Sequence, residues 1–179
     1  MKILAIPASN SRKSINRQLL NYAATLLPDD TVELLDINDY PLPIYSEDVE
    51  AESGVPQPAR DFLDKIAEAD ALLISYAEHN GSYTVAYKNL FDWASRLDRN
   101  VYQNKPIVML ATSPGPGGAG SVLGSAANSA HFFSGEVLAS LSVPSFYEHF
   151  DVEGGRLIDS ELDASLREVL EHLSPVEVA

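Results

Sequence analysis

Short apolar runs alternate along the chain with longer segments in which apolar residues recur at helical spacing. The runs Ile3-Leu4-Ala5-Ile6 and Ala71-Leu72-Leu73-Ile74 are apolar at successive positions, which is typical of strands buried on both faces. Residues 83–97 repeat apolar side chains every three or four positions, which indicates a helix with one buried face. We therefore expect strands at 2–7, 31–37, 71–75, 106–111 and 136–143. We expect helices at 14–27, 57–68, 83–97, 121–134 and 160–173, and a loop rich in proline and acidic residues at 38–56.

This repeated order of strand and helix predicts an α/β fold. Buried strands joined by helices form a parallel sheet that is covered on both faces. Five such units favour the three-layer doubly wound, flavodoxin-like sheet with strand order 2-1-3-4-5. A chain of 179 residues fits one domain over 1–179. Ligands of such sheets bind beyond the carboxyl ends of the strands, at the switch point between the first and third strands. We therefore expect the loops after the first, third and fourth strands to form the site.

Composition and charge exclude several classes of protein. The chain has no cysteine, so it has neither disulfides nor thiolate chemistry. No apolar run approaches the ~18 residues that span a bilayer, and the first residues lack the apolar core of a signal peptide. We therefore expect a cytoplasmic protein with no membrane partner. A formal charge of −14 argues against a nucleic-acid partner, and the spacing of the four histidines predicts no metal site.

The loop after the first strand is rich in hydroxyl, amide and basic side chains. It reads Ala8-Ser9-Asn10-Ser11-Arg12-Lys13-Ser14-Ile15-Asn16 and leads into a helix, whose N-terminal N–H groups and dipole favour a phosphate. Residues 1–30 carry four basic and two acidic residues, a net charge of +2, which suits an anionic ligand. Ser and Asn are also ordinary helix caps, so a capped helix on a solvated turn is an equal interpretation of this loop alone.

The other two loops contain turn and glycine signals. Residues 77–83 hold Asn80-Gly81, a tight-turn pair that presents backbone groups to a planar ligand or simply leads into the next helix. Residues 112–120 hold Gly115, Gly117 and Gly120 in G-x-G-x-x-G spacing. This pattern follows the fourth strand and not the first, and Pro116 interrupts it, so we discount a dinucleotide fingerprint. Close approach of the backbone to a flat ligand is the better interpretation.

Taken together, these loops resemble the NAD(P)H-dependent FMN reductase family, the flavodoxin-like quinone, chromate and azo-dye reductases. The resemblance covers roughly residues 1–145 and rests most on two segments, 77–82 and 88–93. They are similar to the family signatures P-E-Y-N-G-S and K-N-x-x-D-W. The first loop is similar to G-S-x-R-x-x-S-x-N, with its arginine one place later. Three residues depart from the family pattern: Ala8 for Gly, Ala77 for Pro and His79 for Tyr.

The resemblance implies an enzyme in which NADPH or NADH reduces bound FMN. The electrons then go to a small-molecule acceptor such as a quinone, a flavin, an azo compound or a metal oxyanion. Because the cofactor carries the chemistry, it implies no catalytic side chain. It also implies a homodimer or tetramer. The cofactor-binding residues that it implies are Ser9, Ser11, Arg12, Ser14, Asn16, Glu78, His79, Asn80, Gly81, Ser113, Gly115, Gly117 and Gly118.

Three other functions fit the same fold class. A flavodoxin-type electron carrier would use the negative charge to dock on a basic redox partner. A flavin-free binding module is possible because fold does not fix function. An esterase-like hydrolase would need a serine, a histidine and an aspartate within reach of one another, for example Ser9 with His149 or His172. Bound FMN that NADPH reduces without a partner protein would exclude all three.

Overall fold

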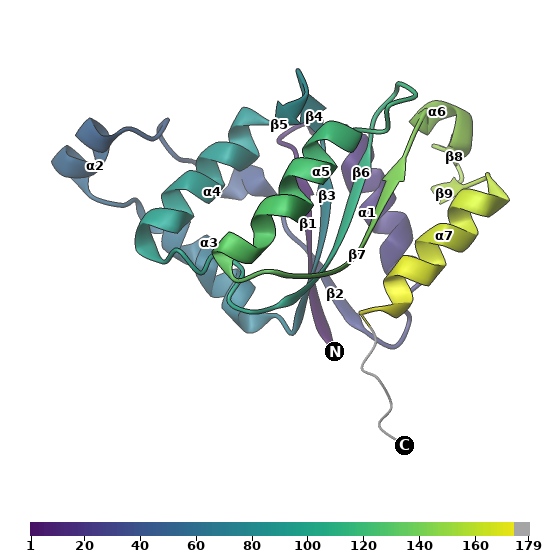
Figure 1. The fold of residues 1–179 in the computed structure, drawn as a ribbon, viewed down its shortest axis with the longest axis horizontal. Coiled ribbons are helices and arrows are strands. Elements are labelled where there is room, and N and C mark those ends of the chain that lie inside the picture. The colour runs from purple at the N-terminus through teal and green to yellow at the C-terminus, as the bar shows by residue number, and fades with distance from the viewer. Residues whose placement is uncertain (174–179) are drawn as a thin grey trace.

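A five-stranded parallel sheet forms the centre of the computed structural model, which describes residues 1–173 (Figure 1). Its strands are β1 (Lys2–Ala8), β2 (Thr31–Leu34), β3 (Ala71–Tyr76), β6 (Pro106–Thr112) and β7 (Glu136–Val143). They are hydrogen-bonded in the order β2-β1-β3-β6-β7, and every neighbouring pair is parallel. Counted within the sheet, this is the order 2-1-3-4-5, so the predicted flavodoxin-like fold class is confirmed.

Helices cover both faces of the sheet (Figure 1). The helices α1 (Ile15–Thr25) and α7 (Ser160–Glu171) pack on one face, and α3 (Gln57–Glu68), α4 (Val85–Leu97) and α5 (Gly120–Ser129) pack on the other. Successive strand residues serve opposite layers: Ile3 lies in the cluster with α1, whereas Leu4 lies in the cluster with α3 and α4. Strands that are buried on both faces therefore explain the unbroken apolar runs.

The segment expected to be a loop at 38–56 contains regular structure. The strand β2 ends at Leu34, before the 3-10 helix η1 (Ile37–Asp39), and the helix α2 (Glu47–Ser53) follows. Ser46 caps α2 by accepting a hydrogen bond from the Val49 N–H at 3.2 Å. Acidic residues in the first turn of a helix stabilise it, because their negative charge lies near the positive end of the helix dipole. The acidic cluster thus begins a helix, so the expectation of a loop was wrong for residues 47–53, whereas residues 41–46 have no regular structure.

Two other segments differ from the predicted elements. The helix expected at 121–134 is α5 followed by the 3-10 helix η2 (Ala130–Phe133). The turn at 77–83 is a hairpin of β4 (Glu78–His79) and β5 (Ser82–Tyr83). Asn80 and Gly81 at its tip have φ of 53° and 76°, the left-handed pair of a two-residue hairpin turn. The predicted tight turn is confirmed.

The sequence predicted no element between β7 and the last helix. The structure has the short helix α6 (Phe146–His149) and a hairpin of β8 (Phe150–Asp151) and β9 (Arg156–Leu157) there. The last helix ends at Glu171, and residues 174–179 lie outside the described residues. None of the described helices combines the length and the apolar character that crossing a bilayer requires.

Candidate functional site

A cleft of about 240 Å³ lies where the loops after β1, β3 and β6 meet. These loops lie at the carboxyl ends of the strands, near the β4–β5 hairpin in Figure 1. Thirteen residues line the cleft: Ser9, Ser11, Lys13, Ser14, Ile15, Asn16, Ala77, Glu78, His79, Thr112, Ser113, Pro114 and Tyr147. All three loops that the sequence singled out therefore contribute. Six of the predicted binding residues are outside this lining: Arg12, Asn80, Gly81, Gly115, Gly117 and Gly118.

The first loop presents the N-terminus of α1 to the cleft. Ser14 caps this helix by accepting a hydrogen bond from the Arg17 N–H at 3.2 Å. Within residues 1–173, the backbone N–H groups of Lys13, Ile15 and Asn16 have no protein acceptor. Free N–H groups at a helix N-terminus form an anion site. The loop therefore offers backbone donors, serine hydroxyls and one cation to a phosphate.

The cation that lines the cleft is Lys13, not the predicted Arg12. Both side chains are exposed, and the two residues are adjacent in the sequence. Which of two neighbouring loop side chains faces a cleft depends on local backbone angles. The sequence contained the signal, two adjacent bases before a helix cap, but could not choose between them.

Asn16 is buried, with 1% of its surface exposed, and its side chain joins three parts of the fold. Its Oδ1 accepts hydrogen bonds from the Ser75 hydroxyl at 2.7 Å and from the Thr112 N–H at 3.2 Å. Its Nδ2 donates to the Thr112 carbonyl at 3.3 Å. The side chain thus fixes the loops that form the cleft, a role that the sequence did not indicate.

The second loop is tied to the elements on both sides of it. The Glu78 carboxylate accepts a hydrogen bond from the Val122 N–H in the first turn of α5, at 2.9 Å. Thr84, the cap of α4, donates its hydroxyl to the Ala8 carbonyl at 3.0 Å. The Glu78 carboxylate is therefore engaged by a helix N-terminus, while the exposed His79 faces the cleft.

The glycines of the third loop have different reasons to be glycine. A Cβ on Gly118, where φ is +57°, would overlap the Ser142 hydroxyl, which donates to the Gly118 carbonyl at 2.8 Å. Gly118 therefore allows this loop to pack against β7. A Cβ on Gly115 or Gly117 would meet no atom within 4 Å. Open space beside these two leaves room for a ligand to approach the backbone.

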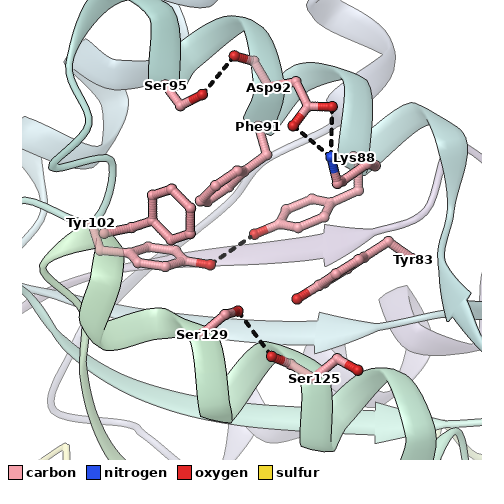
Figure 2. A pocket seen from close by; sticks show the side chains of 10 residues that line it. Tyr83, Lys88, Phe91, Asp92, Ser95, Tyr102, Ser125 and Ser129 are labelled. Carbon is pink, nitrogen blue, oxygen red and sulfur yellow. Dashed lines mark hydrogen bonds and ion pairs between the residues drawn. The ribbon is translucent and has the colours of Figure 1, made fainter.

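A larger cavity, of about 330 Å³, lies between α4 and α5 and shares no residue with the cleft (Figure 2). Its lining is Tyr83, Tyr87, Lys88, Phe91, Asp92, Ser95, Tyr102, Ser125, Ser129 and Phe133. Its one lysine is bound by Asp92 at 2.6 Å. The Tyr87 and Tyr102 hydroxyls lie 3.3 Å apart, and burial raises the pKa of both phenols. Neutral phenols and a paired lysine offer less to an anion than the N-terminus of α1 does.

The fold and the cleft define a flavodoxin-like α/β protein with a cleft at the carboxyl ends of its strands, and comparison with known proteins identifies its family. The chain belongs to the NADPH-dependent FMN reductase family, whose sequence profile matches residues 1–147. This confirms the resemblance drawn from the three loops.

Individual relatives agree with the family. Over 117 residues the chain is 40% identical to a 2-hydroxy-1,4-benzoquinone reductase of a Burkholderia species, covering 64% of this chain and 62% of that protein. Over 116 residues it is 38% identical to an NAD(P)H-dependent FMN reductase of Pseudomonas aeruginosa, covering 64% and 61%. The match thus spans less than two thirds of the length of either relative. Among solved structures, the flavoenzyme NAD(P)H:(acceptor) oxidoreductase FerB of Paracoccus denitrificans superimposes with a TM-score of 0.75 at 26% identity, over 96% of this chain and 94% of that one.

Proposed function

We propose that the protein is an NAD(P)H-dependent oxidoreductase that uses FMN to pass electrons from NADPH or NADH to a small acceptor such as a quinone. The observation that carries the proposal is the convergence of the three loops on one cleft. Family membership and a relative named as a quinone reductase support the same activity. When bound, FMN would supply the hydride and electron chemistry, and the chain would bind and orient it.

The chemistry of the donors in the cleft fits a phosphorylated flat cofactor. Free N–H groups at the start of α1 and the hydroxyls of Ser9 and Ser11 suit a phosphate. Lys13 adds a positive charge in a chain whose net charge is −14. Because the Glu78 carboxylate is bonded to the start of α5, that charge is partly compensated and does not oppose a second anion in full.

We assign the proposed contacts to the cofactor as follows. Ser9, Ser11, Lys13 and Ser14 would hold the phosphate, with Lys13 in the position that the resemblance gave to Arg12. The hairpin segment 78–81 would flank the isoalloxazine on one side. Ser113, Gly115 and Gly117 would flank it on the other, whereas Asn16 and Gly118 would keep these loops in place.

Reduction without a partner separates this proposal from the other functions. We would titrate the purified protein with FMN, following flavin fluorescence, and then add NADPH or NADH without oxygen. The expected result is binding of FMN and loss of the oxidised-flavin absorbance. Reduction that requires a partner protein would support an electron carrier, and failure to bind FMN would exclude the proposed function. Among residues 1–173, Ser9 lines the cleft but His149 and His172 do not, so the pairing that the hydrolase requires is not favoured by the lining of the cleft.

Three further expectations carry over from the sequence analysis, of which the oligomeric state rests on the family. We propose that the protein forms a homodimer or tetramer, that it acts in the cytoplasm, and that the FMN-binding domain extends over 1–179. Light scattering coupled to size-exclusion chromatography would give the mass of the assembly. A monomer at micromolar concentration would contradict the first of these expectations.

A further inference from the structure

A fourth segment reaches the cleft, from outside the three loops that the sequence singled out. Tyr147, in the short helix α6 after β7, lines the cleft together with Lys13 and Ser14. Its side chain is 63% exposed. Within residues 1–173 its hydroxyl makes no hydrogen bond to the protein. An exposed phenol with a free hydroxyl at the rim of the cleft is a candidate to bind an anion there.

The backbone is fixed by the two residues that immediately precede Tyr147. The Ser145 N–H donates to the Gly115 carbonyl at 2.9 Å, and the Phe146 N–H donates to the Ser113 carbonyl at 3.0 Å. Phe146 is fully buried, and its ring stacks on Phe150 with centroids 4.5 Å apart. Because two backbone bonds and one buried ring hold the turn, Tyr147 keeps its place beside the cleft although its ring faces solvent.

The packing of this turn places Tyr147 on the side of α1. Phe146 and Phe150 belong to the core on the face that α1 and α7 cover, and Tyr22 of α1 meets Phe150 edge-on at 6.2 Å. The first loop leads into this same helix. The β4–β5 hairpin leads instead into α4, on the opposite face. The turn that carries Tyr147 is therefore packed on the face of the sheet that α1 covers, the helix whose N-terminus lines the cleft.

We propose that Tyr147 binds the phosphate end of the cofactor, with its hydroxyl donating a hydrogen bond to a phosphate oxygen. A neutral donor of this kind strengthens anion binding without adding charge, and a hydrogen bond to a charged group contributes more than one between neutral groups. This inference rests on the proposed function. It adds a binding residue from the segment after the fifth strand of the sheet, α6, to a site assigned to the loops after the first, third and fourth strands.

Titration with two flavins tests the inference, because riboflavin lacks only the phosphate of FMN. For Tyr147→Phe we expect the Kd for FMN to rise about tenfold, as for the loss of one hydrogen bond to a charged group. The Kd for riboflavin should stay at the wild-type value. Phe132→Ala, which removes another exposed aromatic ring away from the cleft, should change neither Kd. The thermal unfolding midpoint of each apo variant shows whether it folds as the wild type does.

The possible outcomes separate this inference from the proposed function. If the wild-type protein binds FMN, and Tyr147→Phe binds each flavin with the same Kd as the wild type does, the inference is wrong and the proposed function stands. An equal loss of affinity for both flavins also overturns it, because the contact would then not involve the phosphate. If wild-type protein binds no FMN, both proposals fail.

Discussion

Asn16 and Thr112 are hydrogen-bonded to each other twice, although 96 positions separate them in the chain. The amide nitrogen of Asn16 donates to the Thr112 carbonyl at 3.3 Å, and the Thr112 N–H donates to the amide oxygen at 3.2 Å. The Ser75 hydroxyl donates to the same oxygen at 2.7 Å. One buried amide in the first turn of α1 therefore holds the ends of β3 and β6, and with them the loops that form the cleft.

Removing this amide should destabilise the protein strongly. For Asn16→Ala we expect the free energy of unfolding to fall by about 2–3 kcal/mol, because the Thr112 N–H and the Ser75 hydroxyl lose their buried partner. Ser75→Ala, which leaves the Asn16–Thr112 pair intact, should cost about 1 kcal/mol. Urea unfolding of both variants measures the difference. Equal losses would mean that the pair to Thr112 contributes nothing.

The two adjacent bases of the first loop should differ in their effect on cofactor affinity. Lys13 lines the cleft and Arg12 does not, although each substitution by alanine removes one positive charge. For Lys13→Ala we expect the Kd for FMN to rise about tenfold, because an ion pair to the phosphate is lost. For Arg12→Ala we expect a change of about twofold or less at physiological salt. Fluorescence titration measures both, and a larger effect of Arg12→Ala would reverse the assignment.

The sequence was sufficient for those features that depend on local pattern. Runs that are apolar at successive positions, such as residues 3–6 and 71–74, revealed the parallel sheet. Asn80-Gly81 revealed a tight turn, because both residues tolerate a left-handed backbone, although the two short strands that it joins were not predicted. The motif with Ser14 and Asn16 also identified one of the loops that line the cleft. Each of these signals lies within a few residues of the structure that it predicts.

Long-range contacts could not be predicted in this way. The partners of Asn16 lie on two distant strands, so its role in holding β3 and β6 together leaves no local signal in the sequence. Tyr147 follows the fifth strand, in a segment whose own strands, β8 and β9, are two residues long. Strands this short show no periodicity. Their place beside the cleft follows from packing alone.

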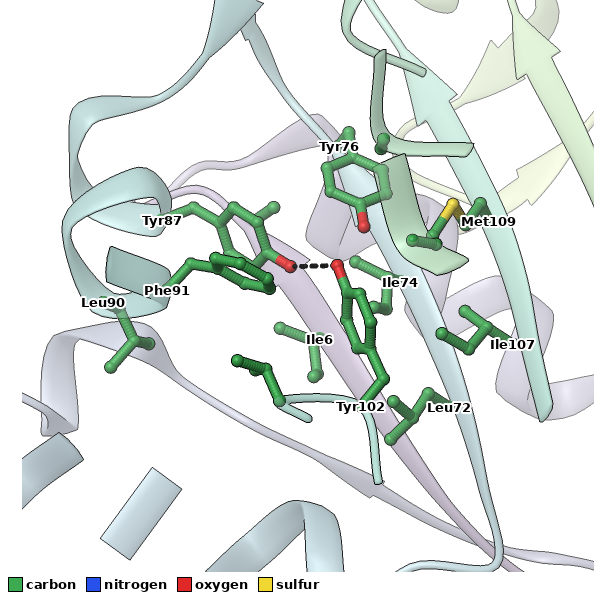
Figure 3. Packing of buried hydrophobic residues seen from close by; sticks show 14 of the residues in the cluster. Ile6, Leu72, Ile74, Tyr76, Tyr87, Leu90, Phe91, Tyr102, Ile107 and Met109 are labelled. Atoms are coloured by element: carbon green, nitrogen blue, oxygen red, sulfur yellow. Dashed lines mark hydrogen bonds between the residues drawn. The ribbon is translucent and has the colours of Figure 1, made fainter. Parts of the chain in front are cut away.

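A buried hydroxyl without a partner should weaken the core on the α4 side. Tyr76 is fully buried, and its hydroxyl has no hydrogen-bond partner among the described residues. Burial holds the pKa of this phenol well above its ordinary value, so the group stays neutral. Figure 3 shows Tyr76 next to the pair that Tyr87 forms with Tyr102. For Tyr76→Phe we expect the protein to gain about 1 kcal/mol of stability, because an unsatisfied polar group is removed.

Tyr87→Phe is the matched control for this change. It removes a hydroxyl from the same cluster, but one that is bonded to Tyr102 at 3.3 Å. We expect a loss of about 1 kcal/mol, since the Tyr102 hydroxyl is left without its partner. Thermal and chemical unfolding would compare the two variants. A loss in Tyr76→Phe as large as that in Tyr87→Phe would show that Tyr76 has a partner after all.

Glu78 should stabilise α5 through its carboxylate oxygen. It accepts from the Val122 N–H at 2.9 Å, and α5 has no side-chain cap of its own because its N-cap residue is Ala119. For Glu78→Ala we expect a loss of about 1 kcal/mol, typical of a missing helix cap. Glu78→Gln keeps an acceptor oxygen, so its unfolding free energy should fall by only about 0.3 kcal/mol, because the charge that interacts with the helix dipole is lost. Unfolding experiments that give equal losses would mean that the charge, not the hydrogen bond, matters.

The opposite end of the sheet should make stability depend on acid pH. Glu33 on β2 pairs with Lys65 at 2.8 Å and with Lys2 at 3.3 Å. The hydrogen bond from Lys65, followed by that from Lys2, holds the pKa of Glu33 below its ordinary value despite partial desolvation. A carboxyl with a depressed pKa stabilises the fold above its unfolded pKa, and this stabilisation is lost as the pH falls through the folded pKa. Glu33→Gln should therefore be less stable than the wild type at neutral pH and should approach it between about pH 5 and pH 3.

Glu153→Gln provides the control for this pH dependence. It removes the same charge from an exposed turn between β8 and β9, where within residues 1–173 the side chain forms no ion pair. The difference in unfolding free energy between Glu153→Gln and the wild type should change little over the same pH range. Because the Glu33 pair is partly exposed, added salt should also reduce the effect of Glu33→Gln at neutral pH. A stability difference for Glu33→Gln that does not shrink on acidification would show that packing at Glu33, and not its charge, holds β2 to α3.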